Sequence, residues 1–396
     1  MTNTQENTCN SCFSKNVTIF HRLEDLPVNS CLLFDNQNDA KNYPRGNLEL
    51  GFCRDCGFIG NLRFNSQLAR YTEGYEEQQS FSPRFNAFAK SLVTKLIDRH
   101  NLHNKTIVEI GCGKGDFLIM LCDLGRNRGV GIDPTYVPGR HDEAALKNVS
   151  FIRDFYSEKY SNYTGDMVCS RHALEHISDT GAFMETVRRA IGDKTNTLVF
   201  FELPDVERVL HECAFWDIYY EHCSYFTLGS LARLFRRSGF EVTDLSKDFD
   251  GQYLLLEAKP ATNGQRSAPL KEEESVEELS KAVAKFQAEY DKTVQLWKRK
   301  VQTARETGQR CVVWGSSSKC VAFLNTIGIK DEIEFVVDIN PYRQGKFLPG
   351  SGKLIVAPKF LKEYRPDVVI AMNPIYLDEI RNDLSSLGLN PELTAV

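Results

Sequence analysis

Four cysteines near the start of the 396-residue chain form two C-x-x-C pairs, Cys9 with Cys12 and Cys53 with Cys56. Each pair directs two thiolates at one point, and two pairs complete the tetrahedral shell that Zn²⁺ prefers. Four protein ligands leave no coordination position open, so we expect a structural zinc that supplies folding energy to a small region. Redox-active or unpaired thiols are the alternative, which the paired spacing makes the weaker interpretation.

A glycine-rich turn, Glu-Ile-Gly-Cys-Gly-Lys-Gly over residues 109–115, follows a short apolar segment. Gly111, Gly113 and Gly115 allow the backbone to turn sharply and to approach a ligand closely. A dinucleotide fingerprint places its third glycine where this chain has Asp116, whose carboxylate would face a pyrophosphate unfavourably. The spacing instead favours S-adenosylmethionine, which has no phosphate and whose cationic amino acid end Glu109 can order. A dinucleotide is the weaker alternative.

Two further acidic positions follow this turn. Asp133 ends the next predicted strand, where a carboxylate can accept hydrogen bonds from both ribose hydroxyls. An NAD-dependent enzyme would also place an acid there, so Asp133 does not distinguish the two cofactors. Asp154 follows the third predicted strand and can receive the adenine amino group, with Phe155 beside the ring. An ordinary surface turn is the alternative for Asp154.

The segment His172-Ala-Leu-Glu-His176 places two imidazoles one helical turn apart, the spacing that zinc peptidases use. Those enzymes carry glutamate directly after the first histidine, where this chain has Ala173, so the sequence does not favour a peptidase. The region after the fourth strand borders both cofactor and substrate in methyltransferases of this fold. His176 is therefore either a pocket residue or a histidine packed in the core.

Residues 219–226, Tyr-Tyr-Glu-His-Cys-Ser-Tyr-Phe, are dense in groups that move protons. If the fold brings Glu221 and His222 together, the carboxylate can tune the imidazole toward a base at neutral pH. Neighbouring tyrosines such as Tyr219 can donate hydrogen bonds to a developing oxyanion. A packed aromatic core segment is the alternative, because such clusters also form cores.

The hydrophobic pattern predicts the elements that position these residues. Apolar segments at 106–110, 128–133, 166–170 and 196–201 alternate with stretches of helical length, which predicts a parallel, doubly wound α/β sheet. Residues 259–269 have linker composition, and 271–305 are predicted to form a long charged helix. The strand–turn–helix pattern restarts at Cys311. Its turn, Gly315 followed by three serines, keeps a single glycine, so we expect no second cofactor there.

The composition narrows the classes of partner. Hydrophobic residues make up 42% and charged residues 26%, values that are ordinary for a globular protein. A net charge of -5 argues against nucleic acid as the main partner. The polar N-terminus and the lack of a long apolar run predict a cytoplasmic protein without a membrane partner. The twelve cysteines then indicate metal ligands and buried thiols rather than disulfides.

Taken together, these motifs resemble the three-domain S-adenosylmethionine-dependent sugar C-methyltransferases of deoxysugar biosynthesis. The resemblance covers essentially the whole chain: the double C-x-x-C, the E-x-G-x-G-x-G turn, residues 219–226 and the tail Val-Val-Asp-Ile-Asn-Pro-Tyr-Arg-Gln-Gly-Lys-Phe-Leu-Pro-Gly at 336–350. It implies a small zinc-binding domain over 1–68 and a class I methyltransferase domain with a Rossmann-like sheet over 69–258. A linker with the long helix over 259–308 and a smaller Rossmann-like, substrate-binding α/β domain over 309–396 would follow.

The resemblance also implies a reaction. Family members methylate the carbon next to the ketone of a nucleotide-linked 4-keto-deoxysugar through an enolate. By motif, His222 would be the base, and Glu221 and Tyr219 would hold the sugar and stabilise the enolate. His176 and one of Tyr71 or Tyr75 would line the same pocket. The nucleotide diphosphate would lie between the central and C-terminal domains.

The chain departs from the family pattern at three places. Tyr220 stands where members commonly have histidine, Gly251-Gln-Tyr253 replaces a Gly-Gly-Ser type of turn, and Gly315 is followed by serines instead of glycines. These departures leave the identity of the sugar open. An O- or N-methyltransferase acting on another small metabolite is the alternative function. A binding protein with a decayed catalytic centre is a third, against which the intact Glu109 turn and Asp133 argue.

Overall fold

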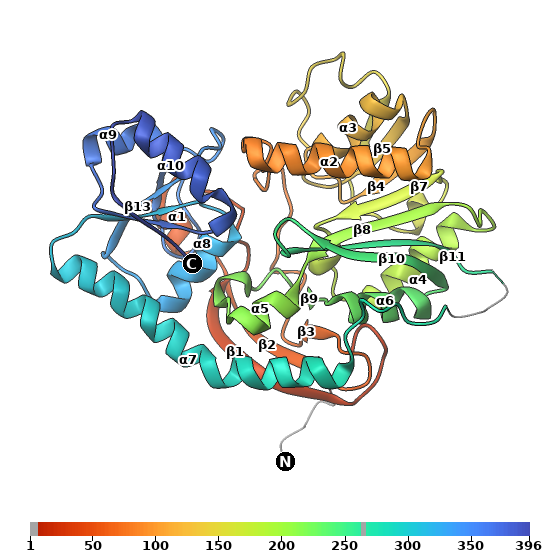
Figure 1. The fold of residues 1–396 in the computed structure, drawn as a ribbon, viewed down its shortest axis with the longest axis horizontal. Helices are drawn as coiled ribbons and strands as arrows, with labels where there is room; N and C mark the ends of the chain where they lie inside the picture. Colours follow the sequence, from red (N-terminus) through yellow and green to blue (C-terminus); the bar gives the residue numbers. More distant parts are fainter. Residues whose placement is uncertain (1–6, 263–266) are drawn as a thin grey trace.

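The computed structural model describes residues 7–262 and 267–396. The polar N-terminus at 1–6 and residues 263–266 of the expected linker lie outside the described residues. The described strands form three sheets, which Figure 1 shows as three units around a common centre. Within the described ranges no helix is both long enough and apolar enough to cross a membrane.

The N-terminal sheet is antiparallel and has four strands in the order β1-β2-β3-β9. Its first three strands are β1 (Val17–Pro27), β2 (Arg45–Cys53) and β3 (Ile59–Asn61), with the short helix α1 (Gln37–Lys41) between β1 and β2. The fourth strand, β9 (Ser224–Tyr225), comes from much later in the chain and pairs Tyr225 with Ile59. The segment that directly follows His222 is therefore part of this sheet.

The central sheet has seven strands in the order β10-β11-β8-β7-β4-β5-β6. Five are parallel: β4 (Thr106–Ile110), β5 (Arg128–Ile132), β6 (Val149–Ile152), β7 (Met167–Arg171) and β8 (Leu198–Pro204). The antiparallel strands β11 (Tyr253–Pro260) and β10 (Phe240–Asp248) complete one edge. The direction of winding reverses between β4 and β7, and ligands of doubly wound sheets bind outside the carboxyl ends of the strands at such a point. The expected α/β fold class is confirmed.

Helices cover both faces of this sheet because side chains alternate along each strand. Ile107 of β4 packs in a core with α2 (Pro83–His100) and α3 (Asp116–Gly125), whereas Val108 packs in a core with α4 (Thr180–Ile191) and α6 (Leu228–Arg237). Short helices complete this unit: η1 (Glu158–Tyr160), η2 (Leu174–His176), α5 (Val206–Glu212) and η3 (Phe215–Asp217).

The C-terminal sheet is parallel, with five strands in the order β14-β13-β12-β15-β16. These are β12 (Cys311–Trp314), β13 (Ile333–Val337), β14 (Leu354–Val356), β15 (Val368–Ala371) and β16 (Glu392–Ala395). The accompanying helices are α8 (Ser318–Ile327), η4 (Pro358–Phe360), α9 (Leu361–Tyr364), η5 (Pro374–Tyr376) and α10 (Leu377–Ser386). A second, smaller Rossmann-like unit is thus present.

The long helix α7 (Val276–Glu306) is a core element and not only a connection. It begins at a capping box in which the Ser275 and Glu278 side chains each bond the other's backbone N–H. Its buried Leu279 and Phe286 belong to a core that also contains residues of β1, β2, α5 and one face of the C-terminal sheet. This helix therefore fixes the C-terminal unit against the N-terminal sheet (Figure 1).

Candidate active site and zinc site

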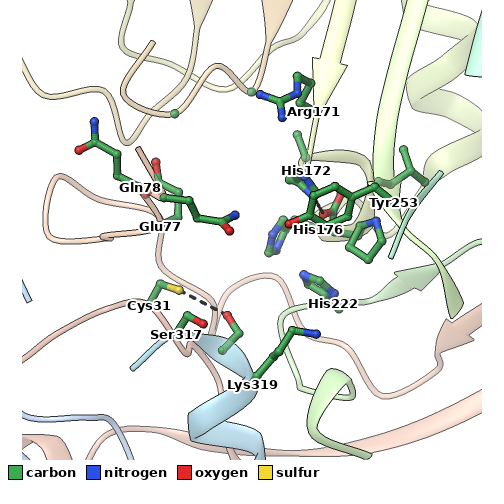
Figure 2. Close-up of a pocket in the computed structure, with 18 of the residues that line it drawn as sticks. Cys31, Glu77, Gln78, Arg171, His172, His176, His222, Tyr253, Ser317 and Lys319 are labelled. Atoms are coloured by element: carbon green, nitrogen blue, oxygen red, sulfur yellow. Dashed lines mark hydrogen bonds and ion pairs between the residues drawn. The ribbon is translucent and has the colours of Figure 1, made fainter. Parts of the chain in front are cut away.

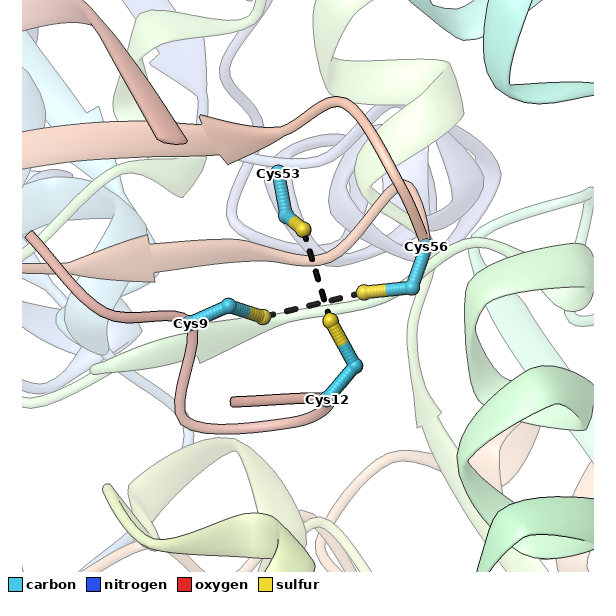
Figure 3. Close-up of side chains that lie close together, drawn as sticks. All are labelled: Cys9, Cys12, Cys53 and Cys56. Carbon is cyan, nitrogen blue, oxygen red and sulfur yellow. Dashed lines mark hydrogen bonds between the residues drawn. The ribbon is translucent and has the colours of Figure 1, made fainter. Parts of the chain in front are cut away.

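The four predicted zinc ligands meet at one point (Figure 3). The Sγ atoms of Cys9 and Cys56 are 3.7 Å apart, and those of Cys12 and Cys53 are 3.6 Å apart. Tetrahedral Zn²⁺ with Zn–S distances of about 2.3 Å requires sulfur atoms about 3.8 Å apart, so the cluster fits this ion. The four cysteines can hold zinc as a closed, structural site. None of them lines the cavity described next.

A cavity of about 610 Å³ lies where the three units meet (Figure 2). Its walls come from the segment before α2, from the carboxyl ends of β4, β5, β7 and β8, and from the start of α8 in the C-terminal unit. Of the predicted residues, the lining includes Tyr71, Tyr75, Glu109, Gly111, Gly113, Asp133, Phe155, His176, Tyr219 and His222. Gly115, Asp154 and Glu221 do not line it.

The glycine turn brings the backbone close to η2. Gly111 has φ +71°, and a Cβ there would lie 2.3 Å from the Cβ of Ala173, so only glycine fits. The N–H of Gly113 donates to Oδ2 of Asp133 over 2.8 Å. Thr135 donates to the other Asp133 oxygen from its N–H and its hydroxyl, each over 2.7 Å. Gly115 then starts α3 in a left-handed conformation.

Glu109 is a buried acid that lacks a full set of partners. Its side chain is 2% exposed, and Oε2 has no hydrogen-bond partner in the described residues. Burial raises the pKa of Glu109 to about 8, although Arg171 acts in the opposite direction. An unsatisfied buried carboxyl at a cavity wall is suited to a cationic or hydrogen-bond-donating ligand. The amino acid end of S-adenosylmethionine, whose sulfonium and ammonium groups are cationic, fits this requirement.

The two remaining cofactor candidates are placed differently. Phe155 is 60% exposed, lines the cavity and meets Tyr71 edge-on with ring centroids 6.3 Å apart. The Asp154 carboxylate points elsewhere, because it accepts hydrogen bonds from Tyr160 and from Lys159, the latter over 3.0 Å. Contact of Asp154 with adenine therefore stays a prediction, because in this structure the carboxylate is hydrogen-bonded to Tyr160 and Lys159 instead.

His222 lies at the centre of the cavity among aromatic rings. Ring centroids of Tyr219 and His176 are 4.2 and 4.8 Å from that of His222. Neither ring nitrogen of His222 has a hydrogen-bond partner among residues 7–262 and 267–396. Burial, together with His176, His172 and Lys319, holds the pKa of His222 well below its usual value. The imidazole is therefore neutral near pH 7 and can accept a proton.

Glu221 points away from its neighbour. Its fully buried carboxylate accepts hydrogen bonds from the Asn29 side chain, the Ser30 N–H and the Tyr75 hydroxyl, each over 3.0 Å. The condition under which Glu221 could tune His222, that the fold brings the two side chains together, is thus not met, because the Asn29, Ser30 and Tyr75 donors bind the carboxylate. Three donors hold it, so Glu221 fixes the segment that carries His222.

Tyr71 and His176 form a second pair beside the base. Nδ1 of His176 lies 3.2 Å from the Glu221 carbonyl oxygen and 2.9 Å from the Tyr71 hydroxyl. A carbonyl can only accept, so Nδ1 carries the hydrogen in the neutral ring and Nε2 keeps its lone pair. The Tyr71 hydroxyl can accept the same Nδ1 hydrogen in a bifurcated hydrogen bond, and its own hydrogen is then available to a ligand.

Two charged residues of the cavity wall, His172 and Lys319, were given no role in the site by sequence reasoning. His172, which has φ +49°, lies 2.8 Å from Glu202 and 3.5 Å from Glu175. Burial opposes its charge, but these two carboxylates raise the pKa of His172 to about 9. Lys319 extends from α8 toward His222 (Figure 2) and pairs with Asp217 over 2.5 Å. The H-x-x-x-H spacing drew attention to His172, but no local signal marks Lys319, which is far from the other site residues in sequence.

Known proteins match the chain along most of its length. Residues 80–245 match the family model of a methyltransferase domain, and residues 254–388 match that of a C-methyltransferase C-terminal domain. The C-methyltransferase NovU of Streptomyces niveus is 26% identical over 361 residues, which are 88% of this chain and 85% of that protein.

Solved structures resemble part of the chain. The PH0226 protein from Pyrococcus horikoshii OT3 is 16% identical with a TM-score of 0.39, over 48% of this chain and 100% of that one. N,N-8-amino-8-demethyl-D-riboflavin dimethyltransferase (RosA) from Streptomyces davawensis is 18% identical with a TM-score of 0.35, over 45% of this chain and 55% of that one.

Proposed function

Because the chain belongs to the multidomain S-adenosylmethionine-dependent C-methyltransferases, we propose that its acceptor is the carbon next to the ketone of a nucleotide-linked 4-keto-deoxysugar. Bound at the Glu109 turn, S-adenosylmethionine supplies the methyl group as an electrophile on a sulfonium. A carbon acceptor must first lose a proton, whereas a neutral amine requires little more than positioning. The proposed activity therefore depends on a base in the cavity.

His222 is the observation that carries this proposal. It is neutral near pH 7, its ring nitrogens have no hydrogen-bond partner within the described part of the chain, and it lies in the same cavity as the cofactor turn. In the proposed reaction its free nitrogen takes the proton next to the ketone, and the electron pair of the C–H bond forms the enolate. The enolate carbon then takes the methyl group.

Hydroxyl groups near His222 can stabilise the enolate oxygen. Burial and the nearby Glu221 raise the pKa of Tyr71 well above its usual value, so its hydroxyl stays protonated. Burial and the nearby Asp217 likewise raise the pKa of Tyr219 well above its usual value, so its hydroxyl also stays protonated. A protonated phenol donates a hydrogen bond to an oxyanion, and such donors are most effective in a site that excludes water. Tyr75 is used differently, because its hydroxyl donates to Glu221.

The nucleotide-linked part of the proposal rests on the C-terminal wall. Ser317, Ser318 and Lys319 line the cavity at the start of α8, a helix of ten residues. A helix N-terminus carries partial positive charge, and a lysine ammonium adds a full charge that suits phosphate. A diphosphate held there would place the attached sugar toward His222, to which Lys319 points in Figure 2.

The deciding experiment follows the acidic proton. Protein saturated with S-adenosylhomocysteine is incubated in D₂O with a thymidine- or uridine-diphospho-4-keto-deoxysugar, and deuterium next to the ketone is measured by NMR. Wild type is expected to exchange this proton, and His222→Gln is expected to lose exchange while still binding S-adenosylhomocysteine. His103→Gln, at an exposed position, is the control and should exchange normally.

Methyl transfer to an oxygen or nitrogen without any exchange would overturn the proposal in favour of heteroatom methylation. Exchange and turnover at the wild-type rate in His222→Gln would show that another group is the base.

A further inference from the structure

The carboxylate that faces the base comes from η2. With Glu221 turned toward Asn29, Ser30 and Tyr75, His222 lacks its sequence neighbour as a partner. A carboxylate oxygen of Glu175, a ring nitrogen of His176 and a ring nitrogen of His222 instead lie within 4.8 Å of one another. Glu175 is 47 positions from His222 in sequence, and the fold alone brings them together.

Glu175 has an oxygen that no protein group satisfies. The residue is 2% exposed, and its Oε2 has no hydrogen-bond partner in the described residues. Oε1 lies 3.5 Å from Nδ1 of His172, whose Nε2 is in turn 2.8 Å from Glu202. A buried carboxylate oxygen without a donor is costly unless a positive charge or a donor forms beside it. One Glu175 oxygen therefore has a cationic neighbour and the other does not.

Hydrogen bonds fix Glu175 relative to His222. The N–H of Cys223 donates to the Glu175 carbonyl over 2.9 Å, and the Ser224 hydroxyl donates to the Ile177 carbonyl over 2.6 Å. His176 contacts the Glu221 carbonyl through Nδ1. These contacts join residues 175–177 to the chain on both sides of His222. The two side chains are thus held in register, as the parts of a catalytic site must be.

The reaction creates a charge where Glu175 lies. When His222 takes a proton from carbon, it becomes an imidazolium in a cavity that already contains the cationic groups of Lys319 and His172. Those cations disfavour a second positive charge. A fixed carboxylate within about 4–6 Å favours the charged form of an imidazole, and this raises its strength as a base.

We propose that Glu175 is a positioning residue of the methyl-transfer reaction, whose buried carboxylate stabilises the imidazolium that His222 becomes on deprotonating the acceptor carbon. This inference rests on the proposed function, because it takes His222 as the base. The proton moves from carbon to His222 and leaves later to solvent or product, and Glu175 acts through charge without taking it. Glu175 thus takes the place beside His222 that the sequence offered to Glu221 on condition that the fold brought the two together.

The pH dependence of His222 must be judged against every group that faces it. Its own segment contributes Tyr219 and Tyr225, η2 and the preceding turn contribute Glu175, His176 and His172, and α8 contributes Lys319. Asp217 of η3 also lines the cavity, but it is paired with Lys319 and Arg208, so Glu175 is the carboxylate that lies close to His222. Removing its charge should therefore make His222 harder to protonate, whereas removing any of the cations should have the opposite effect.

The test uses two variants. Glu175→Gln keeps the size of the side chain and removes its negative charge, whereas Glu175→Asp keeps the charge on a side chain that is shorter by one methylene group. In kcat/KM profiles, Glu175→Gln should move the acid limb down by about one pH unit and lower the plateau about tenfold or more, because a weaker base removes the proton more slowly. Glu175→Asp should restore part of both. Glu277→Gln, which removes an exposed carboxylate of α7 outside the cavity, should leave the acid limb in place.

A second measurement needs no substrate. In protein with ¹⁵N-labelled histidine, the protonation midpoint of His222 is followed by NMR in wild type and both variants. The midpoint should fall in Glu175→Gln and return toward wild type in Glu175→Asp. An unchanged midpoint together with an unchanged acid limb would overturn the inference. If His222→Gln itself keeps proton exchange, the proposed function fails instead, while the NMR titration still decides whether Glu175 and His222 are coupled.

Discussion

Glu109 and Glu221 are both buried glutamates near one cavity, and their hydrogen bonding differs. Three donors satisfy Glu221, so it is a structural anchor. Glu109 has an oxygen without a partner, and burial raises its pKa to about 8. At the scale of single residues, an unsatisfied polar atom is therefore a better indicator of ligand contact than residue type or position in a motif.

The state of Glu109 predicts proton release on cofactor binding. In the free protein near pH 7 this carboxyl is mostly protonated, and a cationic amino group favours its ionised form. Affinity for S-adenosylhomocysteine should therefore rise as pH increases from 7 to 8, with proton release seen by calorimetry in buffers of different ionisation enthalpy. Glu109→Gln should bind about tenfold or more weakly and release no proton from this site. Equal heats in both buffers for wild type would contradict the assignment.

At the scale of elements, the zinc loops also position helices. The Asn10 carbonyl accepts from the N–H of Gly181 at the start of α4, and the Cys56 carbonyl accepts from the Arg233 side chain on α6. Both helices cover the central sheet. Zinc held by the four cysteines would thus stabilise a contact between units as well as the two loops that bind it.

Loss of the metal should be visible in stability. Cys56→Ser should reduce bound zinc and lower the melting temperature, because metal binding contributes to the free energy of folding. Metal analysis of purified protein and thermal unfolding would measure both. Cys122→Ser, which alters a buried thiol outside the cluster, should keep zinc at the wild-type level. Wild-type protein without stoichiometric zinc, purified without chelators, would contradict the zinc assignment.

Local elements could be predicted from the sequence to a large extent. The glycine turn, the parallel strands around it and the restart of the pattern at Cys311 all follow from short-range periodicity and spacing. Pairings between distant segments could not be predicted in this way. Strand β9 has two residues, too few for a periodic signal, and its partner β3 is more than 160 positions earlier. The approach of Glu175 to His222 also joins distant segments, through the contact of the Cys223 N–H with the Glu175 carbonyl, and was missed for the same reason.

At the scale of the whole molecule, the cavity is complete only when all three units are assembled. The N-terminal unit holds Glu221, the central unit supplies the cofactor turn, and α8 brings Lys319 to the far wall. Lys319 and Tyr71 are far apart in the sequence, and no sequence pattern relates them. The sequence resemblance therefore indicated which domains are present but not which side chains meet between them.

The arrangement of the cavity predicts that the C-terminal unit contributes to binding of the nucleotide and not to binding of the cofactor. Lys319→Gln should weaken binding of a nucleoside diphosphate about tenfold or more, because a charge-assisted hydrogen bond to phosphate is lost, and should leave S-adenosylhomocysteine affinity unchanged. Calorimetric titrations of both ligands would measure this. Lys346→Gln removes a lysine paired with Asp35 at the surface and serves as the control. Unchanged nucleotide affinity in Lys319→Gln would exclude this end of α8 as the phosphate contact.

Strand β9 has a consequence for how such chains can recombine. Residues 219–226 belong by sequence position to the central unit, yet Glu221 is bonded to the N-terminal unit and Tyr225 is paired with β3. A crossover that exchanged the first module between two related genes, with its joint near residue 69, would separate this octapeptide from the surface that it completes. Productive chimaeras should therefore need both pieces from the same parent, so the first module and this octapeptide are expected to change together during divergence.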